Sequence, residues 1–259
     1  MWAAGNERDP PTCDAQPYDC IIGVATAKNV VAVGATNSND DSMTSFSSWG
    51  PTDDGRLKPE VVAPGCQVGG DSGVKSTVPG QNYGTACGTS MATPTTSGAV
   101  TLLYEQFSKQ GFFPLPSTIK ALLIHTAKDL GNAGPDYSFG YGRINATEAV
   151  NYIINDSTSN LIVEGNITDQ SELELYELTV AGGQSQLKVT LAWDDPKSSL
   201  VAAKALVNDL NLVLVSPDNT HFYPFILNPS SPSSTATTGV NYLDNIEQVL
   251  INNPQSGVW

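Results

Sequence analysis

A change of hydrophobic pattern near residue 155 constrains the fold of this 259-residue chain more than any other feature. Before it, short runs of Val, Ile and Ala alternate with segments whose apolar residues recur at helical spacing. Beyond it, the apolar runs are strand-like and are separated by turn residues. Alternating strands and helices predict an α/β domain with a parallel sheet, whereas successive short strands predict a β-sandwich or jelly roll. We therefore predict an α/β domain over residues 1–155 and a β-domain over residues 156–259.

The first region contains an apolar run, residues 21–36, that is predicted to form short buried strands of a covered parallel sheet. Residues 50–65 are turn-rich around a short strand at Val61-Val62. Apolar residues at helical spacing predict three helices, over 90–109, 117–128 and 144–154.

The second region begins with a polar stretch, NDSTSN at 155–160, which is typical of a linker. No helical pattern follows it. Strands are instead predicted over 173–180, 187–193, 206–215 and 247–251.

The charge balance excludes two classes of partner. The chain has 12 Lys and Arg against 26 Asp and Glu, a formal net charge of −14, and no basic residue follows Lys204. Nucleic acids and anionic membranes both select clustered positive charge, so we expect neither as a partner. No apolar run approaches the ~18 residues that a membrane-spanning helix requires.

The cysteines and glycosylation sequons give information about whether the protein is cytosolic or secreted. The four cysteines lack Cys-x-x-Cys spacing and neighbouring histidines, which argues against a zinc site. Cys13 and Cys20 are expected to close a short surface loop, with four free thiols as an equal alternative. Sequons of the Asn-x-Ser/Thr type fit a secreted chain, and they begin at Asn145, Asn155 and Asn166. The first residues show no signal peptide, so either the protein is cytosolic or its front end is missing.

The segment Gly88-Thr89-Ser90-Met91-Ala92-Thr93-Pro94 carries the clearest chemical signal. A serine at a helix N-terminus has an exposed Oγ and a free backbone N–H at the positive end of the helix dipole. That N–H can stabilise the oxyanion that forms when Oγ attacks a carbonyl group. An isolated Ser or Thr here would simply cap the helix, but Gly88 and Pro94 make this segment far more specific than a cap.

This heptapeptide resembles the nucleophile motif of the subtilisin-like serine peptidases, the subtilases. Three further parts of the chain resemble the same family in the same order: Ala3-Ala4-Gly5-Asn6, then Val31–Thr36, then 45–51 with 58–65. The likeness covers residues 1 to about 155. It implies the C-terminal part of a peptidase domain, with a partial subtilisin-like parallel sheet and flanking helices.

The resemblance also implies roles for individual residues in the cleavage of protein or peptide substrates. Ser90 would be the nucleophile, and Asn6 would donate its side-chain N–H to the oxyanion. Loss of such a donor costs ~2.7–4 kcal/mol of transition-state stabilisation, a magnitude measured in this same family. Ala3, Ala4 and Gly5 would form one wall of the substrate pocket. This chemistry requires no cofactor.

The chain departs from the family in one decisive respect. The family order is Asp, His and then Ser, yet the only histidines here are His125 and His221, both after Ser90. We expect His125 to be structural and His221 to lie in a loop. Without a base Ser90 is an ordinary hydroxyl, so the chain alone is expected to be inactive. The triad Asp and His, the N-terminal half of the catalytic domain and a secretion signal would then lie ahead of Met1.

The β-region has a likeness of its own. Leu206–Leu212, 216–218 and 247–257 resemble the jelly-roll domain behind some subtilase catalytic domains, akin to the P domain of kexin-like convertases. The likeness stops near Trp259, so we expect this domain to be truncated at its C-terminus. Oxygen ligands of the kind that structural calcium prefers are available in this region: Asp194, Asp195, Asn208, Asp209, Asp244 and Asn245.

Two alternatives remain. An α/β-hydrolase esterase would use a G-x-S-x-G-like segment around Ser90, with His221 and either Asp194 or Asp209. That fold needs a hydrophobic strand directly before the serine, and residues 78–87 do not provide one. The other alternative is a degenerate subtilase homologue that binds partners through its β-sandwich without catalysis.

Overall fold

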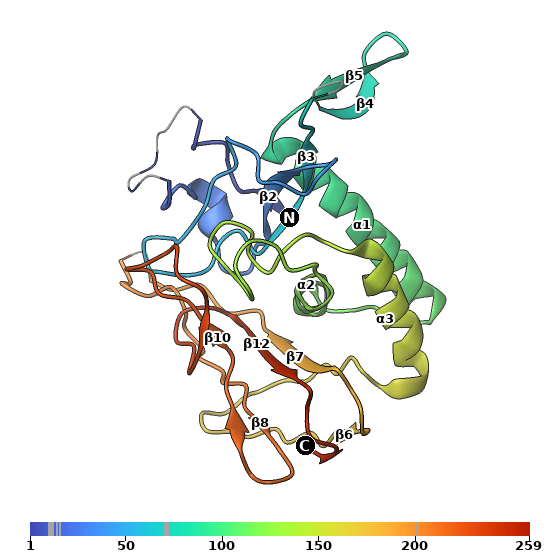
Figure 1. Ribbon diagram of the computed structural model, residues 1–259, viewed down its shortest axis with the longest axis vertical. Helices are drawn as coiled ribbons and strands as arrows, with labels where there is room; N and C mark the ends of the chain where they lie inside the picture. Colours follow the sequence, from blue (N-terminus) through green and yellow to red (C-terminus); the bar gives the residue numbers. More distant parts are fainter. Residues whose placement is uncertain (10–12, 14, 16, 70–72, 200) are drawn as a thin grey trace.

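The computed structural model describes residues 1–9, 13, 15, 17–69, 73–199 and 201–259 (Figure 1). A three-stranded parallel sheet lies at its centre, in the order β1-β2-β3. Its strands are β1 (Trp2–Ala3), β2 (Ala32–Asn37) and β3 (Val61–Cys66). The predicted parallel sheet is therefore confirmed. Only its middle strand comes from 21–36, because the 3-10 helix η1 (Gly23–Thr26) occupies the start of that run.

The three predicted helices are present as α1 (Thr89–Lys109), α2 (Pro116–His125) and α3 (Ala146–Ser159). Helix α1 packs on β2 and β3 through Ala92, which is fully buried beside Val33 and Val61. Farther along, Leu103 and Phe107 of α1 join a second core with α2 and α3. Figure 1 shows α1 and α3 side by side at the right, with α2 seen end-on.

The prediction of a linker at 155–160 is wrong, because α3 continues to Ser159. The Asn145 side chain caps the start of this helix by accepting the Glu148 N–H, and Ile153 anchors it in the core. The polar residues 155–159 form its solvent-facing last turns, and Asn160 ends it in the left-handed conformation at φ 49°. A division of the chain into two domains near residue 155 stays a prediction.

The second region consists of antiparallel strand pairs. The longest pair joins β7 (Gln186–Ala192) to β12 (Ile246–Asn252), close to two of the predicted strands. Shorter pairs are β6 (Thr179–Val180) with β13 (Gly257–Val258), β8 (Leu214–Val215) with β9 (His221–Phe222), and β10 (Phe225–Ile226) with β11 (Thr237–Thr238).

The other two predicted strands are mostly wrong, since only their last two residues lie in strands, β6 and β8. Leu173 and Leu175 alternate as in a strand but are 75% and 80% exposed, and the described residues offer them no partner strand. Two packed sheets are not seen in the described part of this region, so the jelly roll stays a prediction.

A buried carboxylate joins the two regions. Glu60 Oε2 accepts the Ala32 N–H at 2.7 Å, while Oε1 lies 2.5 Å from Lys58 Nζ and 3.4 Å from Lys120 Nζ. Lys120, in α2, also donates to Asn245 Oδ1 at 2.9 Å, beside β12. Burial lowers the pKa of Lys58 to about 8, even though Glu60 favours its charged form.

Several acidic residues considered as calcium ligands have other partners. Asp195 pairs with Lys28 and accepts the Asn208 N–H at 2.8 Å, and Asp244 accepts the Leu57 N–H at 2.8 Å. Within the described ranges, no group of three or more His, Cys, Asp or Glu could hold a metal ion. These carboxylates instead bind the β-region to the α/β part.

No helix among the described residues is both long and apolar enough to cross a membrane.

Replacing Glu60 by Gln should strongly destabilise the chain. The variant leaves the ammonium groups of Lys58 and Lys120 buried without an anion, which costs ~3–5 kcal/mol in comparable buried pairs. Urea denaturation measures the difference in the free energy of unfolding. Glu105→Gln, which breaks an exposed pair with Lys109, is the control and should change nothing measurable. Equal effects of both variants would contradict the assigned role of Glu60.

The stability of the chain should also fall as pH rises through neutrality. Burial raises the pKa of Glu247 to about 8, with the charges of Asp209 and Asp244 adding to the effect. Between the unfolded value of about 4.3 and the folded one, the folded chain holds a proton that the unfolded chain has lost, so stability decreases with pH. Between about pH 5 and about pH 8 the contribution of Glu247 to the free energy of unfolding should fall by ~2–4 kcal/mol. Glu247→Gln should reduce this slope, and an unchanged slope would refute the assignment.

Candidate active site

The motif residues meet at the carboxyl edge of the parallel sheet. Strand β1 ends directly before Ala4, Gly5 and Asn6. Strand β3 is followed by a hairpin of β4 (Val74–Val78) and β5 (Asn82–Ala86), and then by Ser90 in the first turn of α1. Figure 1 shows this hairpin projecting from the top of the molecule, above the start of α1. Open parallel sheets bind ligands at this edge.

Close backbone packing fixes the turn before the serine. The Gly88 N–H donates to the Gly65 carbonyl at 3.0 Å. A Cβ at Gly65 would lie 2.7 Å from both the Gly88 oxygen and the Ala35 Cβ, so only glycine fits there. The disulfide between Cys66 and Cys87 joins the two neighbouring residues. The start of α1 is thereby held against the end of β3.

Thr89 orients the side chain of Asn6. Asn6 Oδ1 accepts two hydrogen bonds from Thr89, one from its backbone N–H at 3.0 Å and one from its hydroxyl at 3.1 Å. Thr89 is fully buried and also accepts the Gly5 N–H at 3.3 Å. With Oδ1 occupied, Nδ2 is directed toward Gly88, where it lies 3.8 Å from the position of a Cβ. The sequence offered a signal for this role, since Thr89 stands directly before Ser90, but its importance was not foreseen.

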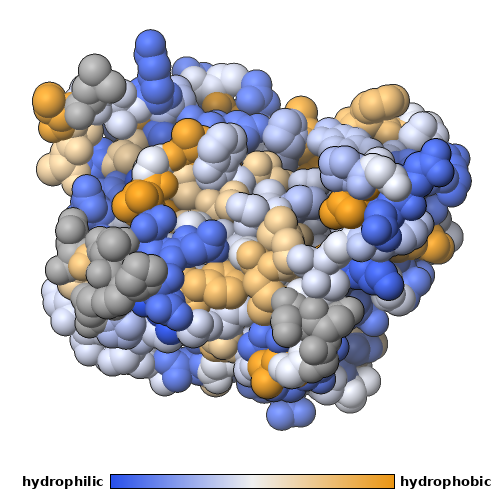
Figure 2. Space-filling model, turned by 90° about the horizontal axis from the view of Figure 1, so that it is seen from above, coloured by the Kyte–Doolittle hydropathy of each residue, from blue (hydrophilic) through white to orange (hydrophobic). Residues whose placement is uncertain are grey.

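Ser90 is exposed at the second position of α1. An N–H in the first turn of a helix has no acceptor within the helix, and it lies at the positive end of the dipole. No hydrogen bond joins Ser90 Oγ to any of the described residues. The structure thus brings an exposed hydroxyl, a helix N-terminus and the Asn6 amide to one edge of the sheet. Figure 2 looks onto this end of the molecule, where the strongly hydrophobic residues lie in separate spots.

The predicted pocket wall is mostly backbone. Ala4 is buried in a small core with Ile21 and Ala32, so its methyl group is turned away from solvent. Gly5 has φ of 113°, and a Cβ there would lie 2.8 Å from Ser48 Oγ. Ala3 is half-buried. The substrate-binding role of these three residues stays a prediction.

Neither histidine lies beside Ser90. His125 Nδ1 is 3.0 Å from Thr190 Oγ1, and its ring meets Tyr152 edge-on at 4.8 Å. Burial, with a contribution from Lys188, lowers the pKa of His125 to about 4, as expected for a packed structural histidine. His221 lies in β9, and Figure 1 places the β8–β9 pair at the opposite end of the molecule from the start of α1. Strand β5 is largely exposed, unlike the buried strand that an esterase nucleophile requires.

All four cysteines form disulfides. The expected link between Cys13 and Cys20 is confirmed, and Cys66 pairs with Cys87. The alternative of four free thiols is therefore wrong.

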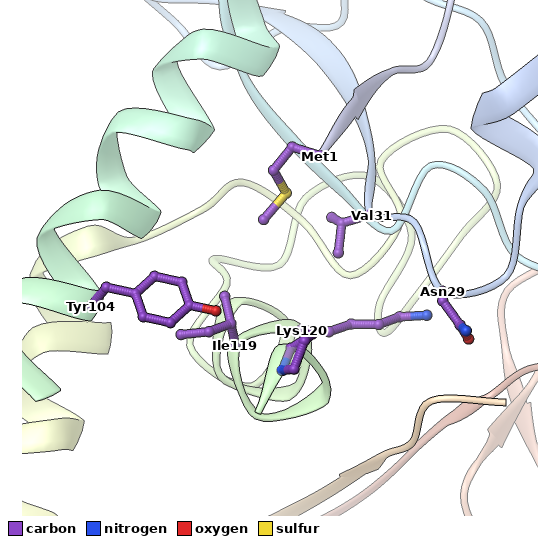
Figure 3. A pocket seen from close by; sticks show the side chains of 7 residues that line it. Met1, Asn29, Val31, Tyr104, Ile119 and Lys120 are labelled. Carbon is purple, nitrogen blue, oxygen red and sulfur yellow. The ribbon is translucent and has the colours of Figure 1, made fainter. Parts of the chain in front are cut away.

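A separate cavity lies at the amino end of the sheet, remote from Ser90. It has a volume of about 170 Å³ and opens between α1, α2 and the segments before β1 and β2 (Figure 3). Its lining residues are Met1, Asn29, Val31, Tyr104, Pro116, Ile119 and Lys120. Sequence reasoning did not foresee this cavity.

Comparison with known proteins finds a family and several similar proteins. Residues 1–142 match the model of the subtilase family. Serine protease AprX of Bacillus subtilis is 32% identical over 162 residues, covering 57% of this chain and 34% of AprX. Serine protease/ABC transporter B family protein tagA of Dictyostelium discoideum is 26% identical over 209 residues, covering 66% of this chain and 11% of tagA. The chain thus spans a minor part of each relative.

Among solved structures, the self-cleaved protease domain of PatA is 29% identical. The match covers 59% of this chain and 49% of the PatA chain, with a TM-score of 0.46.

Gly65→Ala tests the packing that holds the start of α1. The added methyl group must displace Gly88 or Ala35, and overpacking of this kind costs ~1–3 kcal/mol of stability. Gly98→Ala, in α1 with open space around the new Cβ, is the matched control and should stabilise by ~0.5–1 kcal/mol. Urea unfolding of both variants measures these changes. A neutral Gly65→Ala would contradict the close contact.

Proposed function

The chain belongs to the subtilase family, and from that premise we propose that it forms the serine-bearing part of an endopeptidase. In this proposal Ser90 Oγ attacks the carbonyl carbon of a peptide bond, forms an acyl ester and releases the amine. The observation that carries the proposal is the placement of the Asn6 amide and the Ser90 N–H at one edge of the sheet.

These two donors would form the oxyanion hole. The hydrogen bonds from Thr89 hold Asn6 Oδ1, so its Nδ2 group is the part free to donate to a developing negative charge. Donors fixed before the reaction need no reorganisation in the transition state, which is why they contribute strongly to catalysis.

The proton of Ser90 requires a base, and we propose that the base and its carboxylate partner come from polypeptide outside these 259 residues. The His125 ring contacts Thr190, and His221 lies in β9 at the other end of the molecule, which supports this division. The small share of its relatives that the chain spans is consistent with it. On this proposal the chain alone has no substantial peptidase activity.

Substrate would lie along residues 3–5 as part of the same proposal. Because Ala4 is buried and Gly5 lacks a side chain, this wall would contact a peptide through its backbone. It would therefore contribute shape and hydrogen bonds rather than side-chain selectivity.

We also propose that the chain is exported and that its β-region belongs to a jelly-roll domain. The two disulfides support export, because disulfides persist in oxidising compartments. The antiparallel pairing of β7 with β12 supports an all-β domain but leaves its sheet arrangement open to test.

A fluorophosphonate probe tests the peptidase proposal. When the chain is extended by the polypeptide encoded ahead of Met1, the probe should label Ser90, whereas the 259-residue chain should stay unlabelled.

In the extended protein Asn6→Ala should lower kcat for a peptide substrate by ~10²–10³-fold, because one oxyanion donor is lost. Mass spectrometry locates the label, and steady-state kinetics measures kcat.

Ser90→Ala in the extended protein is the control and should abolish labelling. A folded extended protein whose Ser90 is not labelled would refute the proposal and favour the non-catalytic homologue. Hydrolysis of a p-nitrophenyl ester that is lost in His221→Ala would favour the esterase instead.

A further inference from the structure

The three Asn-x-Ser/Thr sequons lie in different surroundings. Asn145 caps α3, with its Oδ1 accepting the Glu148 N–H at 3.2 Å. Asn155 lies inside α3. Asn166 is exposed in the irregular segment that follows this helix, and its amide makes no hydrogen bond to the described residues. Only this third sequon is free of both a capping role and a helix.

Helical geometry disfavours glycosylation at Asn155. The Ser or Thr of a sequon must approach the Asn amide two residues earlier, but side chains two residues apart on a helix do not face each other. Ser157 Oγ instead donates to the Ile154 carbonyl at 2.7 Å. Asn166 and Thr168 lie outside any helix, and the Thr168 hydroxyl makes a long, exposed contact of 3.5 Å with Asp169 Oδ2.

Residues 161–178, called here the 161–178 segment, form a loop fixed at both ends. At its start Glu164 accepts the Leu115 N–H at 2.8 Å, before α2. At its end Leu178 exchanges two backbone hydrogen bonds with Trp259, next to β6 and the C-terminus (Figure 1). In between, Glu172 accepts the Thr168 N–H at 2.7 Å and closes a turn. Asn166 therefore projects from a structured loop.

Exposed apolar side chains lie in the same segment as this asparagine. Tyr176 is 57% exposed, and its hydroxyl would lie 3.3 Å from a Cβ at Gly165, the residue before Asn166. Ile167, Leu173 and Leu175 are exposed in the same segment. Where exposed apolar side chains form a continuous patch on a protein surface, another molecule or group usually covers it. The C–H faces of sugar rings can pack on such side chains while their hydroxyl groups stay in water.

We propose that Asn166 carries an N-linked oligosaccharide that covers the exposed apolar side chains of the 161–178 segment. In this reaction a bond forms between Asn166 Nδ2 and the anomeric carbon of a lipid-diphosphate-linked oligosaccharide. The bond from that carbon to the phosphate oxygen breaks, the lipid diphosphate leaves, and the amide loses one proton. This inference rests on the proposed export of the chain, which the two disulfides support, and not on the chemistry of Ser90.

Secretion of the 259-residue chain from a eukaryotic host, behind a cleavable leader, provides the test. Enzymatic deglycosylation in heavy-oxygen water converts each occupied asparagine into a labelled aspartate, which peptide mass spectrometry then locates. We expect the label at Asn166, with Asn155 and Asn145 little occupied. Thr168→Ala should abolish the label while Asn166 itself is unchanged, and Ser157→Ala, in the helical sequon, is the matched control.

Dye binding tests whether the glycan covers apolar surface. Deglycosylation of the folded protein should raise the fluorescence of a hydrophobic dye on the order of twofold. The increase should disappear when Leu173 and Leu175 are both replaced by Thr. An unmodified Asn166, or equal occupancy at all three sequons, would overturn the site. Occupancy without any change in dye binding would overturn the covering role.

Discussion

The carboxylate of Glu60 is the contact on which the arrangement of the two regions depends. It accepts the backbone N–H of Ala32 in β2 and pairs with the ammonium groups of Lys58 and Lys120. Buried charges are stable only when both partners are present and further hydrogen bonds satisfy them, so this group acts as a unit. Because Lys120 also reaches Asn245, the sheet, α2 and the β-region are positioned by one buried set of charges.

The candidate site depends on that arrangement indirectly. The sheet presents β1 and β3 at one edge, and the glycine contact between residues 65 and 88 sets the start of α1 against β3. The hydrogen bond from the Thr89 N–H then fixes the side-chain amide of Asn6 relative to the start of α1. The turn that leads into Ser90 is therefore held by close backbone contacts and buried hydrogen bonds. The side chain of Ser90 itself is exposed to solvent.

Sequence reasoning predicted the parallel sheet, the three helices and the strands that became β7 and β12, because strong periodicity and burial agree in those segments. It failed at 155–160, where polar residues form exposed helix turns anchored by Ile153. It also failed at 173–177, where strand-like alternation has no partner strand among the described residues. The local sequence pattern does not specify which distant segment a helix or strand packs against. The serine motif was found because its residues are contiguous, whereas the roles of Gly65 and Thr89 depend on contacts across more than 20 and more than 80 residues.

The disulfide at the base of the β4–β5 hairpin gives β3 and α1 a covalent link that does not run through the backbone of the hairpin. Cys66 and Cys87 are 21 residues apart, and the hairpin between them is largely exposed. A peptide bond broken within that loop would leave β3 and α1 joined through sulfur, with the Gly65–Gly88 contact still in place. Natural variation in the length of the loop would be tolerated for the same reason, since a surface insertion adds little to the entropic cost of closing it. The sequence and length of the hairpin can therefore change while the position of Ser90 at the start of α1 is retained.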